Sequence, residues 1–282
     1  MKDFSFVDET LDLNRAHSYR LSIQFNLNGF SFSILDLVRG KFVALKHASL
    51  DEVETYEKKA EKIQEIFNSD PCLQVNYKKV TNLVVSPRSV LIPSPYFKQK
   101  DLIQYFTFNY DLDELEEIHF NFIPGIGAYN IFSIPNPVSN VIMEKYNRTQ
   151  FYHQGLPIID YHINSSHTHH SYAVLSVYED FFDIALFKGS RLHLYNSFQW
   201  SSPEDVLYYL LYIYKQQNLN VAENELLITG DLGNKKEIKK TIDQYLKKVR
   251  LEKPPSEFTY SYTFKKDHSN HFTNLFRLNL CV

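Results

Sequence analysis

The sequence predicts an α/β fold with mixed sheets that is built from two similar βββαβ halves. Apolar and alternating runs separated by short turns predict strand-strand-strand-helix-strand over residues 19–85. The same order recurs over residues 172–229, with turns and helix starts at matching places. A content of 20 Tyr and 22 Phe against 8 Gly also suits β-rich packing.

The first half begins with three strands, predicted over residues 19–25, 30–37 and 41–48. The turn at residues 26–29 has asparagines and a glycine, which tolerate positive φ. Ser49 and Glu52 form a capping box, which predicts a helix from Ser49 to Phe67. Pro71 cannot continue that helix, and residues 79–85 predict the closing strand.

The second half repeats this order. Its strands are predicted over residues 172–177, 181–187, 191–197 and 225–229. Between the last two, Ser202 is a helix cap and Pro203 occupies the preferred first position of a helix that runs to about Gln217.

Further elements lie between and after the halves. They are predicted as helices over residues 94–106, 137–146 and 235–248, strands over 118–122, 129–133 and 258–264, and an extended segment over 150–161. We therefore divide the chain into an N-terminal subdomain with inserted elements, residues 1–170, and a C-terminal subdomain with a tail, residues 171–282.

The composition predicts a soluble cytoplasmic protein. No stretch approaches the roughly 20 apolar residues of a membrane span, and the N-terminus does not resemble a secretory signal. Cys72 and Cys281 give no disulfide framework. A net charge of −3 gives no sign of a basic face, so we expect neither a membrane nor a nucleic acid as partner.

This arrangement resembles the actin-like ATPase fold, a ribonuclease H-like fold of two such halves. The layout is similar to the bacterial FtsA-like and PilM-like proteins, and the chain looks closest to a bacterial family known only as a domain of unknown function. The segment from Phe181 to Gly230 carries that likeness. Its motifs are Asn196-Ser-Phe198, Asp205, Tyr208-Tyr209 and Leu227-Ile-Thr-Gly230. The resemblance implies a fold more firmly than an activity.

Active members of the actin-like family bind the phosphates of ATP with two hairpins, the first of which has an acidic residue, glycine and small hydroxyl residues. The matching stretch here, from Gln24 to Gly29, lacks the carboxylate and contains two bulky apolar residues. The second matching stretch, from Ser176 to Phe181, has no glycine, and its Glu179-Asp180 pair would repel a triphosphate. We therefore expect no ATP hydrolysis, no catalytic residue and no cofactor.

If a nucleotide binds, we expect it at five residues. Gly230 keeps half of the glycine pair that accommodates adenosine in the family, Asp231 stands at the place of the second glycine, and Gly233 follows. Asn26 and Asn28 add polar groups in the first hairpin. Gly230 also has a structural interpretation, a strand-to-helix turn, which we favour.

Four histidines precede the second half: His162, His167, His169 and His170. On a strand His167 and His169 would face the same side, which is a two-ligand arrangement for zinc. Because no acidic motif accompanies them, we interpret the cluster as a polar, solvated linker and predict no metal site.

Three other sets of residues receive structural interpretations. We interpret His119 and His153 as surface or satisfied core residues, and the tyrosines of residues 208–214 as helix core. The seven lysines and arginines of residues 235–250 are interpreted as a solvated helix face.

Taken together, these observations predict a non-catalytic pseudo-ATPase that acts as a protein-binding or scaffold module. The identity of the protein partner and the oligomeric state stay open. One alternative is a nucleotide-binding enzyme with altered phosphate loops. Another, an accessory protein linked to rRNA modification, follows only from the resembled family. An exposed apolar patch in or beside the interdomain cleft would favour the protein-binding module, and basic residues concentrated on one face would favour the last alternative.

Overall fold

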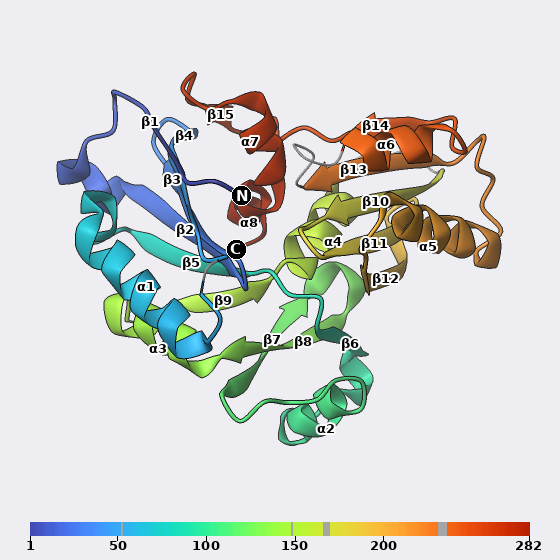
Figure 1. The fold of residues 1–282 in the computed structure, drawn as a ribbon, viewed down its shortest axis with the longest axis horizontal. Coiled ribbons are helices and arrows are strands. Elements are labelled where there is room, and N and C mark those ends of the chain that lie inside the picture. Colours follow the sequence, from blue (N-terminus) through green and yellow to red (C-terminus); the bar gives the residue numbers. More distant parts are fainter. Residues whose placement is uncertain (52, 148, 166–169, 231–235) are drawn as a thin grey trace. The chain divides into compact units, whose positions relative to one another are not determined.

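The computed structural model describes residues 1–51, 53–147, 149–165, 170–230 and 236–282, which form two compact units (Figure 1). Unit 1 comprises Met1–Phe122, Gly127–Leu156 and Ser256–Phe264, and unit 2 comprises Ile123–Ile126, Pro157–Pro255 and Lys265–Val282. Within the described residues, no helix is long and apolar enough to span a membrane.

Unit 1 contains a sheet with the strand order β1-β4-β3-β2-β5-β9, in which β15 lies beside β4. In chain order these strands are β1 Phe4–Val7, β2 Tyr19–Asn26, β3 Gly29–Asp36, β4 Lys41–Ser49, β5 Lys79–Val84, β9 Gln150–His153 and β15 Thr259–Tyr260. Helices α1 (Tyr56–Ser69) and α3 (Asn136–Lys145) cover one face of this sheet, where Phe30, Phe67 and Ile142 belong to one buried core (Figure 1).

A smaller sheet with the order β6-β8-β7 is inserted into unit 1. It consists of β6 Ser89–Pro93, β7 Glu116–Ile123 and β8 Ala128–Pro135, and it is accompanied by the short helix α2 Leu102–Thr107. Short segments of 3-10 helix occur at Leu13–Ser18, Pro71–Leu73, Ser94–Tyr96, Gln99–Asp101 and Pro124–Ile126.

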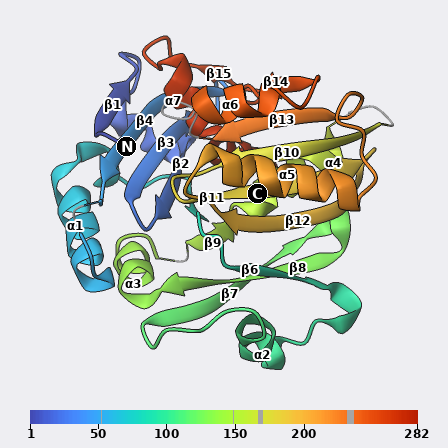
Figure 2. The ribbon, with the colours of Figure 1, turned by 45° about the vertical axis from the view of Figure 1, so that its right-hand side comes forward.

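Unit 2 contains a sheet with the order β12-β11-β10-β13-β14. Its strands are β10 Ser171–Val177, β11 Phe181–Lys188, β12 Arg191–Gln199, β13 Glu225–Gly230 and β14 Val249–Leu251. Helices α5 (Pro203–Gln216) and α6 (Lys236–Asp243) pack on one face of it (Figure 2). The remaining helices are α4 Gly155–Asn164, α7 Lys266–His271 and α8 Thr273–Cys281.

The predicted fold class, with two βββαβ halves and mixed sheets, is confirmed. The order β4-β3-β2-β5 in unit 1 has the same form as β12-β11-β10-β13 in unit 2. In each half the first and last strands pair parallel and the three strands of the meander pair antiparallel.

The two helix caps that the sequence predicts have opposite outcomes. Ser202 caps α5 in a capping box with Asp205, and Pro203 is the first helical residue, as predicted. The predicted start at Ser49 is wrong, because β4 continues through Ser49 and α1 begins only at Tyr56, capped by Thr55. The backbone N–H of Ser49 donates to Asp3 instead, and the following Leu50 donates to the first hairpin, so the segment stays extended.

Two predictions for the region between the halves are also wrong. The helix expected over residues 94–106 is interrupted, because Phe97 is extended and its ring stacks on Tyr129 with centroids 3.7 Å apart. The extended segment expected over residues 150–161 ends at His153, and α4 follows it. Leu156, Ile158 and Ile159 bury their side chains in that helix, and burial of this kind cannot distinguish a strand from a helix in a short apolar run.

Two elements near the C-terminus are shorter than predicted. Helix α6 ends at Asp243 rather than at residue 248, and Lys235 lies outside the described residues. The strand expected over residues 258–264 is reduced to Thr259–Tyr260. Ser261 ends it with a local turn, because its hydroxyl accepts the N–H of Thr263 and its carbonyl accepts that of Phe264.

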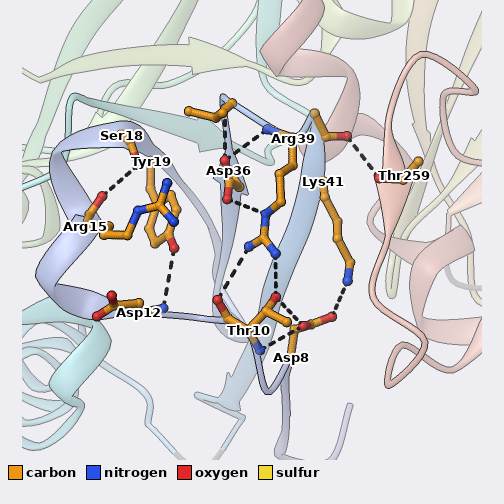
Figure 3. A network of polar contacts seen from close by, with 12 residues as sticks. Asp8, Thr10, Asp12, Arg15, Ser18, Tyr19, Asp36, Arg39, Lys41 and Thr259 are labelled. Carbon is orange, nitrogen blue, oxygen red and sulfur yellow. Dashed lines mark hydrogen bonds and ion pairs between the residues drawn. The ribbon is translucent and has the colours of Figure 1, made fainter.

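A polar network fixes the N-terminal segment onto the meander of unit 1 (Figure 3). The Arg39 guanidinium lies between Asp36 and Thr10, with Nε 2.6 Å from Asp36 Oδ2 and Nη1 2.7 Å from Thr10 Oγ1. Lys41 Nζ lies 2.7 Å from Asp8 Oδ2. Burial alone would raise the pKa of Asp8, but hydrogen bonds from Lys41 and Thr10 outweigh it and hold that pKa well below its ordinary value.

Candidate functional site

The strand registers show which positions of the two hairpins correspond. In unit 1, Asn26 pairs with Gly29 around a two-residue loop. In unit 2, the N–H of Tyr178 donates to the carbonyl of Phe181 at 2.9 Å, again around two residues. Asn26 therefore corresponds to Tyr178, and two residues earlier Gln24 corresponds to Ser176.

The loop of the first hairpin uses its backbone groups within unit 1. Asn26 Oδ1 accepts the N–H of Asn28 at 3.0 Å, and the Asn28 carbonyl accepts the N–H of Leu50 at 2.9 Å. An amide that a phosphate oxygen would have to reach is thus already bonded to a side chain of the same loop. Leu27 projects from the tip and is half exposed.

A lysine occupies the remaining acceptor of this loop. Lys59, on α1, donates from Nζ to the Leu27 carbonyl at 2.5 Å, and its residue is only 8% exposed. Burial lowers the pKa of Lys59. Lys59 was not among the predicted site residues. Its signal in the sequence is a lysine on the same helix face as the buried Ala60 and Ile63.

In the second hairpin, a buried tyrosine stands where glycine is expected in an ATP-binding loop. The Tyr178 ring stacks on Phe181 with centroids 4.5 Å apart, and its hydroxyl accepts from Asn274 Nδ2 at 3.1 Å. The Tyr178 carbonyl accepts from the indole of Trp200 at 3.3 Å. Burial raises the pKa of Tyr178 well above its ordinary value. Glu179 and Asp180, in contrast, are exposed.

Beside this hairpin lies a buried carboxylate that the sequence analysis did not single out. Asp183 is opposite Ser176 on β10 and opposite Ser197 on β12. Its Oδ1 accepts the Ser197 hydroxyl at 2.6 Å and its Oδ2 accepts the Tyr195 hydroxyl at 3.0 Å. Its signal in the sequence is a single carboxylate within the otherwise apolar run Phe181–Phe187. Both carboxylate oxygens are engaged by protein hydroxyls.

Gly230 has a steric reason to be glycine. Its φ is +93°, and a Cβ at this position would lie 2.2 Å from the carbonyl oxygen of Val177, which is its partner on β10. Contacts under 3.0 Å with backbone require the chain to shift. This close approach at the end of β13 accounts for the residue without a nucleotide, in line with the structural interpretation favoured above.

The five residues predicted for a nucleotide are placed as follows. Asn26 and Asn28 are joined by their hydrogen bond in unit 1, and Gly230 belongs to unit 2. Asp231 and Gly233 lie outside the described residues. That set stays a prediction.

Of the four clustered histidines, His162 is not part of a solvated linker, and that prediction is wrong for it. It lies on α4, fully buried, with Nε2 3.3 Å from Glu252 Oε1. Glu252 also accepts from Arg277 Nη2 at 2.7 Å. His167 and His169 lie outside the described residues. In the part of the chain that the structure describes, no three His, Cys, Asp or Glu side chains are grouped as metal ligands.

His153 is a satisfied core residue, which is one of the two interpretations made for it. Its Nδ1 accepts from Asn130 and from the N–H of Gly155, so Nε2 carries the proton and donates to the Ser86 carbonyl at 2.9 Å. Burial lowers the pKa of His153 to about 4. His119 is half-buried and lies 2.7 Å from Glu117.

The tyrosines of α5 divide between core and surface. Tyr214 is buried as predicted, but Tyr208 and Tyr212 are 64% and 51% exposed and stack on each other, so the core interpretation is wrong for these two. In the basic segment, Ile238 and Ile242 face the core while Lys236 and Lys240 face solvent, as predicted.

In unit 1 the segment from Tyr96 to Phe108, called the inserted segment below, presents large apolar side chains to solvent. Phe108 is 88%, Tyr96 72% and Ile103 62% exposed. Phe106 of the same helix is fully buried, so α2 is anchored by one side and exposes the other. A run of exposed aromatic and aliphatic side chains on one short segment is characteristic of an interaction surface.

Comparison with known proteins places this fold. The family model "Protein of unknown function (DUF3822)" matches residues 8–249. A Bacteroides thetaiotaomicron protein with an actin-like ATPase fold and unknown function is similar at a TM-score of 0.82 and 26% identity, over 97% of this chain and 100% of that one. No functionally curated protein matches.

Two further structures share the fold at lower similarity. The PilM-PilN type IV pilus biogenesis complex matches with a TM-score of 0.57 and 9% identity, over 93% of this chain and 97% of that chain. The ethanolamine utilization protein EutJ from Carboxydothermus hydrogenoformans matches with a TM-score of 0.55 and 8% identity, over 98% and 93%. The predicted resemblance to the actin-like ATPase fold is confirmed.

Proposed function

The chain belongs to the DUF3822 family of proteins of unknown function and has an actin-like ATPase fold, and we propose that it is a non-catalytic pseudo-ATPase that acts by binding a protein partner. The loss of ATPase activity is supported most strongly by the second hairpin. Tyr178 occupies that loop with a buried ring, and its backbone N–H and carbonyl both bond within unit 2.

The first hairpin supports the same proposal. A phosphate site gains affinity from free amides, a cation and an acid that positions the cation. Here the Asn28 amide is bonded to Asn26, and Lys59 is directed to the Leu27 carbonyl. Gln24 lies in β2 at the place of the acid and cannot replace a carboxylate as a partner for magnesium.

Protein binding is supported by the exposed apolar side chains of the inserted segment. Ile103 and Phe108 remain in water in unit 1, although each side chain would gain about 1.5–3 kcal/mol on full burial. PilM, which shares the fold, occurs in a complex with PilN. We propose a cytoplasmic location, in keeping with the free thiols of Cys72 and Cys281.

The catalytic part is tested by calorimetric titration with Mg-ATP and by phosphate release. We expect no heat of binding at millimolar nucleotide and no release above background, both for the natural chain and for Glu179→Gly/Asp180→Gly. Removing the two carboxylates relieves repulsion but leaves the buried Tyr178 in place. Micromolar ATP affinity in the natural chain would replace this proposal with the nucleotide-binding enzyme.

The partner part is tested by affinity capture from native cells with quantitative mass spectrometry. A partner captured by the natural chain is expected to be lost, at least tenfold, with Ile103→Ser/Phe108→Ser. Tyr262→Ser, which changes a side chain that is 74% exposed elsewhere in unit 1, is the matched control and should retain it. Equal capture by all three chains would exclude the inserted segment as the binding surface.

A further inference from the structure

Unit 1 has a pocket of about 440 Å³ at the end of its sheet that is opposite to the first hairpin. Strands β2, β5 and β9 run parallel, so their N-terminal ends lie at one edge of the sheet, whereas the hairpin follows the C-terminal end of β2. The pocket is lined by Asn76, Tyr77, Lys78, Lys79, Val80, Lys145, Tyr146, Asn147, Thr149 and Gln150. Its volume is within the range of small-molecule sites.

The lining carries three positive charges and no negative one. Lys78 is exposed, whereas Lys79 and Lys145 are half-buried. None of the described lining residues is an aspartate or a glutamate, and in the described part of the chain no ion pair involves these three lysines. By contrast, Lys46 of the same unit has a carboxylate partner, Asp70, at 2.8 Å.

A fourth cation adds to the positive potential beside this pocket. Arg20 on β2 is the register partner of Lys79 on β5, and like charges on neighbouring strands destabilise a sheet. The pKa of Lys79 is lowered by burial and, after that, by Arg20. The fold therefore holds the Arg20 guanidinium beside the Lys79 ammonium group, where an anion would stabilise both.

The two tyrosines of the lining use their hydroxyls within the protein. The Tyr77 hydroxyl donates to the Cys72 carbonyl at 2.6 Å, and the Tyr146 hydroxyl donates to the Leu73 carbonyl at 2.8 Å. Both hydroxyls are thus directed to the backbone. The side-chain amides of Asn76 and Asn147 offer further donors at the rim.

We propose that this pocket binds a small anion with at least two phosphate groups. One phosphate monoester carries up to about two negative charges at neutral pH, which is fewer than the three lysines of the lining. Two linked phosphates match that charge and occupy more of the volume than a single one. Lysine ammonium groups bind phosphate oxygens as point charges, and this site is separate from the hairpins that bind ATP in active relatives of the fold.

The experiment is a calorimetric titration of the full chain with pyrophosphate and with orthophosphate, without magnesium and at constant ionic strength. Pyrophosphate is used instead of ATP so that this test is independent of the proposed pseudo-ATPase function. We expect one saturable site for pyrophosphate and at least tenfold weaker binding of orthophosphate. Lys79→Gln/Lys145→Gln should weaken pyrophosphate binding at least tenfold.

Two further variants keep the result interpretable. Lys236→Gln/Lys240→Gln removes the same charge from the exposed face of α6 in unit 2 and should bind pyrophosphate like the natural chain. Lys79→Arg/Lys145→Arg keeps the charge and should retain binding within about threefold, which excludes a folding defect as the cause of the loss. No saturable binding, or equal weakening in the α6 control, would overturn the proposal.

Discussion

In unit 1 the hairpin between β2 and β3 turns through Asn26, whereas in unit 2 the corresponding hairpin between β10 and β11 turns through Tyr178. The asparagine bonds to its own loop, at 3.0 Å from the Asn28 nitrogen. The tyrosine instead packs on Phe181 and bonds to Asn274 of α8. Two side chains of unrelated chemistry thus close loops of the same length. The shared topology constrains the backbone, and each half fills its loop in its own way.

The same comparison applies at the ends of the closing strands. Val84 of β5 pairs with Phe25, and Gly230 of β13 pairs with Val177, at matched places in the two halves. A valine is accepted in unit 1, but in unit 2 a Cβ would collide with the Val177 carbonyl. The glycine therefore reports a local approach of two strands in unit 2, and this approach is not a requirement of the topology.

The largest expected effect concerns the buried carboxylates of the two units. Glu252→Gln leaves Arg277, which is 1% exposed, without its ionised partner, and we expect unit 2 to lose about 4 kcal/mol of stability. Asp8→Asn in unit 1 should cost less, about 2 kcal/mol, because Lys41 is partly exposed and can reach water. Urea unfolding followed by circular dichroism measures both, and Trp200 fluorescence reports on unit 2 alone.

Glu252→Gln should also change how the stability of unit 2 depends on pH. Burial would raise the pKa of Glu252, but Arg277 and His162 outweigh it and hold that pKa below its ordinary value. A carboxyl of this kind stabilises the fold above its unfolded pKa of about 4 and loses that contribution as the pH falls. Glu252→Gln should therefore reduce the loss of stability below pH 4. If the stability of Glu252→Gln falls below pH 4 as steeply as that of the natural chain, Glu252 is not the group responsible.

The next effect tests the difference between Gly230 and Val84. We expect Gly230→Ala to cost about 3 kcal/mol, because the methyl group requires a backbone shift at Val177 and strains a positive φ. Val84→Ala removes two buried methyl carbons without backbone strain and should cost about 2 kcal/mol. Urea midpoints at pH 7 are the measurement, and a Gly230→Ala chain as stable as the natural one would refute the close approach.

A smaller expected effect is a loss of stability in unit 1 at mildly acidic pH. His153 of unit 1 has a pKa of about 4, below its unfolded value of about 6.5, because its ring is buried. A base of this kind leaves stability intact above pH 6.5, and the stability falls as the pH drops from 6.5 towards 4, by about 2–3 kcal/mol in total. Hydrogen exchange at pH 7 and pH 5 should show loss of protection in unit 1 before unit 2.

The matched control for this pH dependence is His153→Gln, which keeps a donor for the Ser86 carbonyl and does not titrate. Its stability should be lower at pH 7 but nearly constant between pH 6.5 and 5. A slope equal to that of the natural chain would assign the proton to another group.

The strands of the two βββαβ halves could be predicted from the sequence to within two residues, because apolar runs and turn residues are local signals. The helix start at Ser49 could not, because Ser49-Leu-Asp-Glu52 satisfies a local capping rule while Asp3, from a distant segment, takes the Ser49 amide. Helix α4 was missed for a different reason, because its short apolar run fits the period of a helix as well as that of a strand. Lys59 and Asp183 escaped notice in the candidate site because their partners come from other elements.

The smallest expected effect tests whether the first hairpin depends on its own asparagine. Asn26→Ala removes the acceptor of the Asn28 N–H and should cost about 1 kcal/mol, the usual net value of one hydrogen bond. Asn26→Asp is the matched variant, because it keeps an acceptor oxygen and should remain within about 0.5 kcal/mol of the natural chain. Neither should gain a thermal shift with Mg-ATP, since Lys59 and Leu27 still occupy the loop. If Asn26→Ala is as stable as the natural chain, the hydrogen bond does not hold the loop. The difference between the two hairpins would then reduce to the buried ring of Tyr178.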